Sequence, residues 1–208
     1  NQMYFAHPEV HPWSLKYDNQ ALSWTFEEVP FVTPPTEWVV GNYPSVTTIF
    51  QSRLWMGGTP LQPSNIWASK TGKYEDFAKA NQAAGDGLAF EVSTTGKFKW
   101  FKGRTGLLIG TNEGEWLCSA SEGLIQPSDY NFSQQTGYAC SAVQPVYVGQ
   151  QILYSGTNGS KIRATHSSYE AQGYVGQDIS LIANSLFANG VKEIHYAPDP
   201  NYTLFAIT

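Results

Sequence analysis

The stretch RLWMGGTPLQPSNIWAS, from Arg53 to Ser69, consists of two short apolar runs on either side of a turn rich in Gly and Pro. Apolar runs of this length around turn residues are typical of two antiparallel strands joined as a β-hairpin. Four more stretches have the same outline, so the sequence predicts five hairpins. The other four are MYFAHPEVHPWSLKY (residues 3–17), GLLIGTNEGEWLCSA (106–120), QILYSGTNGSKIRATHS (151–167) and EIHYAPDPNYTLFAIT (193–208), with the first one spanning 53–69.

The spacing of these hairpins favours one kind of all-β fold. Measured between the turns at His7, Gly58, Gly110, Gly156 and Ala197, the spacings are about 51, 52, 46 and 41 residues. This is the period of a four-stranded propeller blade, whereas the turns of a β-sandwich recur about every 8–12 residues. We therefore predict an all-β, β-propeller-like repeat of four-stranded blades, with each hairpin in the middle of a blade. Five complete blades hardly fit into 208 residues, so we expect an incomplete propeller.

Composition agrees with a globular, strand-rich chain. The 208 residues are 41% hydrophobic, 14% aromatic and 14% charged, with 19 Gly and 12 Pro. The net charge of −5 disfavours a general nucleic-acid binder. Cys118 and Cys140 are expected to be buried free thiols, and no apolar run is long enough for membrane insertion. A start at Asn1 and an end within a strand pattern lead us to expect that residues 1–208 are one propeller segment of a longer chain.

The connections between the hairpins predict three further elements. The segment SWTFEEVPFVTPP (23–35) is typical of an edge strand followed by a linker, and GLAFEVSTTGKFKWFKG (87–103) of another hairpin. The segment GQDISLIANSLFANG (176–190) predicts one short α-helix, with Ile179, Ile182 and Leu186 on one side. Asp178 is its expected N-cap, and Asn189-Gly190 its end.

The order of several motifs resembles one protein family. These motifs are Tyr43-Pro44, Phe50-Gln51-Ser52-Arg53-Leu54, Gly58-Thr59-Pro60, Ile66-Trp67-Ala68-Ser69, Gly110-Thr111 with Glu113-Gly114-Glu115-Trp116, and Tyr174 ahead of the expected helix. Together they resemble the tail nozzle proteins (tail tubular protein B) of short-tailed bacteriophages, over nearly the whole chain. The resemblance implies a structural protein of the virion tail that forms a six-fold ring, a hexamer, and a conduit for genome ejection. It implies contacts with other tail proteins, such as the adaptor and fibres, transient passage of DNA, and neither catalysis nor cofactors.

One basic stretch departs from the acidic balance of the chain. KFKWFKGR concentrates Lys97, Lys99, Lys102 and Arg104, partly alternating with Phe98 and Trp100. These four cations are the candidate contacts to DNA or to a partner. The favoured interpretation is a strand with a solvated basic face and inward aromatic rings.

Catalytic and metal-binding interpretations find little support. A glycosidase needs two carboxylates across a cleft, which a sequence cannot show. The acids weighed for this role are Glu27, Glu28, Glu91, Glu113, Glu115 and Asp178, of which Glu113 and Glu115 flank a predicted turn and are expected to be solvated. His7 and His11 lack further ligands and are followed by Pro, so zinc is not expected, and His166 and His195 are isolated.

Two alternatives to the nozzle remain open. Seven Trp and twelve Tyr are enough to form a glycan-binding or glycan-hydrolysing propeller, although we expect Trp55, Trp67, Trp100 and Trp116 to pack in the core. A packaged-DNA stabilisation or tail plug protein has the same outline in sequence. Exposed coplanar rings beside a carboxylate pair would favour the glycan alternative.

Overall fold

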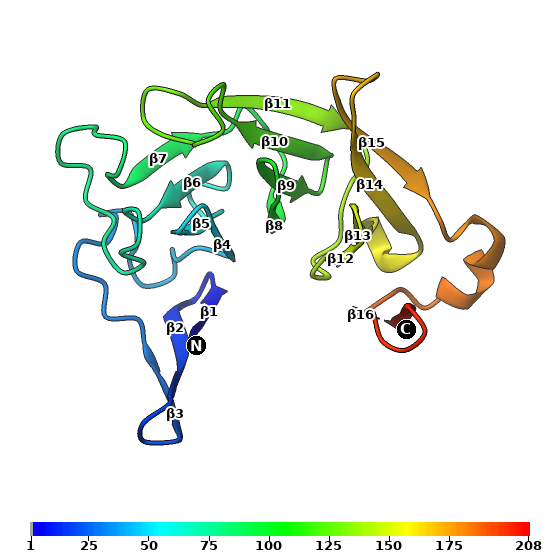
Figure 1. Cartoon of the computed structure of the whole chain (residues 1–208), viewed down its shortest axis with the longest axis horizontal. Helices are drawn as coiled ribbons and strands as arrows, with labels where there is room; N and C mark the ends of the chain where they lie inside the picture. The colour runs from blue at the N-terminus through cyan, green and yellow to red at the C-terminus, as the bar shows by residue number, and fades with distance from the viewer. Residues whose placement is uncertain (1) are drawn as a thin grey trace.

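The computed structural model describes residues 2–208 as an all-β chain, and this part of the fold prediction is confirmed. Five antiparallel sheets follow one another in sequence order (Figure 1). The first contains β1 (Gln2–His7), β2 (Val10–Asp18) and β3 (Ser23–Glu28). The second contains β4 (Val46–Phe50), β5 (Arg53–Gly57), β6 (Asn65–Ala68) and β7 (Leu88–Glu91). The third contains β8 (Phe98–Gly103), β9 (Leu107–Thr111), β10 (Glu115–Ser119) and β11 (Asn131–Thr136).

The remaining two sheets form the C-terminal part of the chain. The fourth contains β12 (Val146–Val148), β13 (Gln151–Ser155), β14 (Ile162–Ser168) and β15 (Gly173–Asp178). The fifth contains β16 (Glu193–Ala197) and β17 (Thr203–Ile207). Along each four-stranded sheet the strands keep their sequence order, so the first and last strands form its two edges.

The sheets are arranged along an open arc, with the two chain ends at its opposite ends (Figure 1). The first strands of the four-stranded sheets, β4, β8 and β12, lie on the inner side of the arc, and the last strands lie on the outer side. Neighbouring inner strands contact each other, as in the pairs β1 with β4, β4 with β8 and β12 with β16.

The predicted hairpins occupy two different places in their sheets. The hairpins β5–β6, β9–β10 and β13–β14 are the middle two strands of four. The hairpin β1–β2 belongs to a three-stranded sheet, and β16 and β17 are the two strands of the fifth sheet, so neither lies in the middle of four strands among the described residues. A turn signal specifies that two strands pair, but not which other strands extend the sheet on either side.

Two other predictions are also wrong. The segment 87–103 is no hairpin, because β7 lies at the outer edge of the second sheet and β8 at the inner edge of the third. The α-helix is absent from the described residues, where only two 3-10 segments form: η1 (Thr157–Gly159) and η2 (Leu181–Phe187). Asp178 belongs to β15, where its carboxylate accepts from the backbone and hydroxyl of Ser180. The φ of −118° at Ala183 interrupts η2, which ends at Phe187, and Gly190, at φ +79°, lies beyond that end.

One apolar cluster fills each space between consecutive sheets. Trp38, Leu54 and Met56 pack beneath Tyr4 and Ala6 of the first sheet. The clusters between the later sheets centre on Trp55 with Phe101, on Trp100 with Tyr154, and on Leu153 with Ile194. The second and third sheets are each covered on both faces by their neighbours, so every residue of β5 and of β9 is buried. Burial of consecutive residues is expected of strands that are covered on both faces.

Aromatic rings that lie over glycines allow the sheets to approach closely. A Cβ on Gly103 of β8 would meet Phe50 of β4 at 2.2 Å, and one on Gly57 of β5 would meet Phe101 of β8 at 2.8 Å. A larger residue at either glycine would therefore push the second and third sheets apart.

None of the described helical segments is long and apolar enough to cross a membrane.

Candidate functional site

The basic stretch lies on β8, at the inner edge of the third sheet, and a bulge sets the direction of its side chains. Phe98 and Trp100 pair with the consecutive residues Thr111 and Gly110, so Lys99 is the extra residue of a β-bulge. The bulge allows Phe98 and Phe101 to pack toward the second sheet and Trp100 to pack toward the fourth. All three rings are buried, whereas Lys97 is exposed and Lys99 half-buried.

The four cations do not form one cluster. Lys97 precedes β8 and Arg104 follows it, so they lie at opposite ends of a strand of 6 residues, which is about 20 Å long at about 3.3 Å per residue. Lys102 turns toward the fourth sheet, where its Nζ lies 4.7 Å from the ring centroid of Tyr147, and burial lowers the pKa of its ammonium. The Tyr147 hydroxyl donates to the carbonyl of Gly103. Lys102 is therefore part of the contact between sheets, and Lys97, Lys99 and Arg104 are the cations most open to an outside ligand.

A groove of about 270 Å³ adjoins two of these cations. Lys97 and Lys99 line it together with Phe98 of β8 and with a wall of Pro8, Gly58, Thr59, Pro60 and Pro63. The groove offers cations and mainly apolar walls, with no carboxylate in its lining. It is suited to contact an anionic or extended ligand and lacks the acid pair that glycoside hydrolysis requires.

Glu115 corrects the expectation that both acids beside the turn are solvated. Glu113 is exposed and accepts from the hydroxyl of Thr95 at 2.6 Å, whereas the side chain of Glu115 is completely buried between the third and fourth sheets. Glu115 Oε2 accepts from the hydroxyls of Thr136 at 2.7 Å and Tyr154 at 3.1 Å. Burial raises the pKa of Glu115, and the two hydroxyls and the charge of Arg163 oppose the rise.

Other polar atoms around Glu115 remain without partners. Neither Glu115 Oε1 nor the buried indole Nε1 of Trp100 has a hydrogen-bond partner in residues 2–208. Burial also raises the pKa of the nearby Cys140 thiol, and that of Cys118 to about 12. Both cysteines are free and buried, as predicted. Glu115 is enclosed between the third and fourth sheets, so its carboxylate takes part in the packing of these sheets and is not accessible to a substrate.

The remaining acids and histidines are dispersed. Glu27 pairs with Lys16 at 3.1 Å, Asp178 pairs with Lys161 at 3.2 Å, and Glu28 and Glu91 are exposed on different sheets. No three metal-ligating side chains come together in the part of the chain that the structure describes. The four histidines, His7, His11, His166 and His195, lie on β1, β2, β14 and β16.

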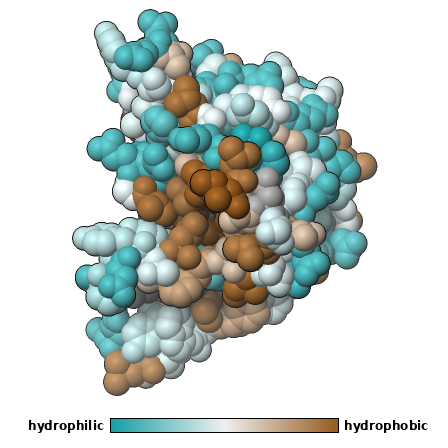
Figure 2. Space-filling model, turned by 90° about the vertical axis from the view of Figure 1, so that its right-hand side faces the viewer, coloured by the Kyte–Doolittle hydropathy of each residue, from teal (hydrophilic) through white to brown (hydrophobic). Residues whose placement is uncertain are grey.

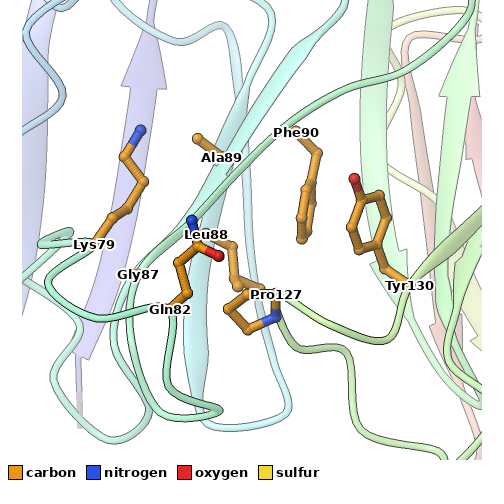
Figure 3. A pocket seen from close by; sticks show the side chains of 8 residues that line it. All are labelled: Lys79, Gln82, Gly87, Leu88, Ala89, Phe90, Pro127 and Tyr130. Atoms are coloured by element: carbon orange, nitrogen blue, oxygen red, sulfur yellow. The ribbon is translucent and has the colours of Figure 1, made fainter.

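A second groove, of about 400 Å³, lies at the outer edge of the second sheet (Figure 3). Phe90 of β7 stacks on Tyr130, with ring centroids 4.0 Å apart, while Lys79 and Gln82 come from the loop before β7. The sequence does not reveal this groove, because Phe90 and Tyr130 are far apart along the chain. The two rings cover one flat face of each other, and Tyr130 is 46% exposed.

The tryptophans expected in the core are largely buried. Trp55 and Trp100 are completely enclosed, Trp67 is nearly so, and Trp116 is half-buried. These rings therefore fill the space between sheets and offer no platform for a sugar.

No family model matches the chain, and no curated protein matches it.

Proposed function

We propose that the chain is a non-catalytic, propeller-type scaffold of the tail nozzle family of short-tailed phages. In this role it assembles into a hexameric ring of the virion tail, contacts other tail proteins and surrounds the path of the ejected genome. The observation that carries the proposal is the arc of consecutive sheets packed face to face with their first strands inside (Figure 1). The order of the sequence motifs is the reason for proposing the tail nozzle family in particular.

The mechanical properties of the sheets suit this role. Sheets whose middle strands are buried on both faces, with aromatic rings set over glycines of the neighbouring sheet, resist deformation because close-packed interiors have low compressibility. A rigid wall of this kind holds its shape while a stiff polymer passes. Binding of a small substrate would instead require convergent polar groups in a pocket.

The charge distribution also favours passage over retention of DNA. Every phosphate that a protein neutralises strengthens binding through release of counterions. The chain has a net charge of −5, and its basic stretch is spread along β8, with Lys102 directed at Tyr147. A continuous cationic track is therefore not formed by this stretch.

Duplex-DNA binding over a series of salt concentrations tests the proposal. A conduit is expected to bind duplex DNA no more tightly than ordinary non-specific binding, with a dissociation constant of about 10⁻⁴–10⁻⁶ M at physiological salt. Replacing Lys97, Lys99 and Arg104 together by Gln is expected to weaken this binding further and to flatten its salt dependence. The matched control replaces Lys73, Lys79 and Lys192 by Gln, three exposed lysines outside the basic stretch, and is expected to change both less.

Assays on the same purified protein distinguish the scaffold from the two alternative functions. Sub-micromolar DNA retention at physiological salt would contradict a conduit and favour the packaged-DNA stabilisation or plug protein. Release of oligosaccharides from bacterial surface polysaccharide, or saturable binding to it, would contradict the scaffold and favour the glycan alternative.

A further inference from the structure

The groove of about 270 Å³ beside β8 lies where three consecutive sheets meet. Pro8 comes from the turn between β1 and β2, Pro60 from the turn between β5 and β6, and Lys99 from β8. The second sheet lies between the first and the third in the arc (Figure 1). The groove therefore crosses one end of the second sheet, and the lysines of its lining come from the third sheet alone.

Hydrogen bonds hold the turn that forms the proline side of the groove. The Thr59 hydroxyl donates to Gln62 Oε1 at 2.7 Å and accepts from the backbone N–H of Gln62 at 3.0 Å. The buried side chain of Asn42 donates to the same oxygen at 3.1 Å and accepts from the backbone N–H of Leu61 at 2.9 Å. This side of the groove is thus preformed, which reduces the entropy that a ligand loses on binding.

The two lysines of the groove are available to a negatively charged ligand. Lys99 is the extra residue of the β-bulge, and bulges commonly change the direction of a side chain. Lys97 is held at its backbone, where the N–H donates to Asn112 Oδ1 at 2.5 Å. In the part of the chain that the structure describes, neither ammonium forms an ion pair. Two positive charges therefore await neutralisation by a ligand of opposite charge.

The combination of charge and apolar surface indicates the class of ligand. Interfaces with nucleic acid are polar and strongly positive, whereas this lining has two cations and is otherwise mainly apolar, with Phe98 and three prolines. Pockets that enclose small molecules have volumes of about 300–1,000 Å³. The groove is slightly smaller than that range, so it is suited to hold a few side chains of a larger molecule.

An extended peptide presents acidic and apolar groups to the groove at the same time. Successive side chains of an extended chain point to opposite sides, with a rise of about 3.3 Å per residue. When acidic and apolar residues alternate, all carboxylates lie on one side of the peptide and all apolar side chains on the other. The carboxylates then meet Lys97 and Lys99, while the apolar side chains meet the prolines.

We propose that this groove binds an extended segment of a partner protein in which acidic and apolar residues alternate. The inference rests on the proposed scaffold role and names the chemistry of a segment that the scaffold would hold. Extended segments are commonly recognised in this manner, with specificity set by where alternate side chains fit.

Fluorescence anisotropy of a labelled pentapeptide, Glu-Leu-Glu-Leu-Glu, tests the proposal on the full chain. Saturable binding is expected, and it should weaken as salt is added. One exposed ion pair changes affinity about twofold to fivefold, so Lys97→Gln combined with Lys99→Gln should weaken binding about tenfold. The matched control replaces Lys73 and Lys192, two exposed lysines outside the groove, by Gln. It changes the net charge equally and should leave the affinity nearly unchanged.

The apolar side of the groove is tested by a second variant and a second peptide. Pro60→Asp places a negative charge beside the carboxylates of the peptide and should also weaken binding. Leu61→Asp is its matched control, because Leu61 is 75% exposed in the same turn and does not line the groove. Circular dichroism verifies that each variant is folded. The peptide Glu-Ser-Glu-Ser-Glu has the same charge without apolar side chains and is expected to bind much more weakly.

Adsorption of the leucine peptide elsewhere is tested on the side of the molecule that contains η2. Apolar side chains gather there (Figure 2), and in η2 Leu181 is 68% exposed and Ile182 is fully exposed. Ile182→Ser should leave peptide binding unchanged. In nuclear magnetic resonance spectra, the amide signals of Ser45, Gly58 and Lys99 should shift when the peptide is added, because these residues line the groove.

Three results would overturn the proposal. The first is the absence of saturable binding at peptide concentrations up to about 1 mM. The second is equal loss of binding in the groove variant and the lysine control. The third is equally tight binding of the serine peptide, which would mean that only anions are recognised and would favour DNA phosphate as the ligand. None of these results affects the scaffold role, which ring formation tests separately.

Discussion

Substitution of Gly110 by Ala tests how the third sheet is packed. A Cβ at Gly110 would lie 2.2 Å from Cε2 of Trp100, whose ring is completely buried against Tyr154 of the fourth sheet. The ring must move by more than 1 Å to reach an ordinary contact of about 3.5 Å. Overpacking of this kind costs about 1–3 kcal/mol, and the stiffer unfolded chain returns about 0.4–1 kcal/mol.

We therefore expect Gly110→Ala to lose about 1–2 kcal/mol of unfolding free energy, which corresponds to a melting temperature lower by about 2–8 °C. Differential scanning calorimetry and urea unfolding measure the two quantities. Gly85→Ala is the matched control, because a Cβ there meets nothing within 4 Å and should be neutral or slightly stabilising. In a Trp100→Leu background the cost of Gly110→Ala should shrink, because the obstructing ring is gone. If Gly110→Ala were as harmless as Gly85→Ala, the packing argument would be refuted.

Two further predictions concern buried charges. Burial raises the pKa of Glu115, so the folded state binds its proton more tightly than the unfolded state, and its contribution to stability falls as pH rises through the raised pKa. Glu115→Gln cannot titrate, and urea unfolding at several pH values should show the variant gaining relative to wild type as pH rises; the opposite slope would contradict the burial argument. The buried guanidinium of Arg53 donates to the carbonyls of Ser69, Ala84 and Asp86, and Arg53→Met should cost roughly 1–3 kcal/mol and accelerate hydrogen exchange in residues 79–86. Unchanged exchange there would show that Arg53 does not anchor that loop.

The hairpins could be predicted because their determinants are local. Turn residues such as Asn158 and Gly159, which adopt positive φ, specify a reversal between two apolar runs. The assignment of β7 and β8 to different sheets depends on contacts between distant residues. The bulge at Lys99 could not be predicted either. A strict alternation of side chains would put Phe98 and Trp100 on one face of the strand, whereas the bulge turns them toward different sheets.

The predictions of an α-helix over 176–190 and of a solvated Glu115 were wrong for the same reason. In the segment 176–190 the spacing of apolar residues favoured a helix, yet Ile182 and Leu186 are exposed and no core lies beneath them. A periodic pattern shows which residues would share a face, but not whether another element covers that face. Glu115 follows a turn and suggested solvation, but the fourth sheet packs over it and brings the hydroxyl of Tyr154 to its carboxylate. In both cases the burial of the side chains depends on whether another element packs over them, and the local sequence does not contain that information.

Electron-microscopic class averaging of the purified protein, at concentrations where it associates, tests the central claim most directly. The scaffold account predicts six-fold rings with an open axial channel. Particles that remain monomeric, or trimers with outward-facing clefts, would contradict it.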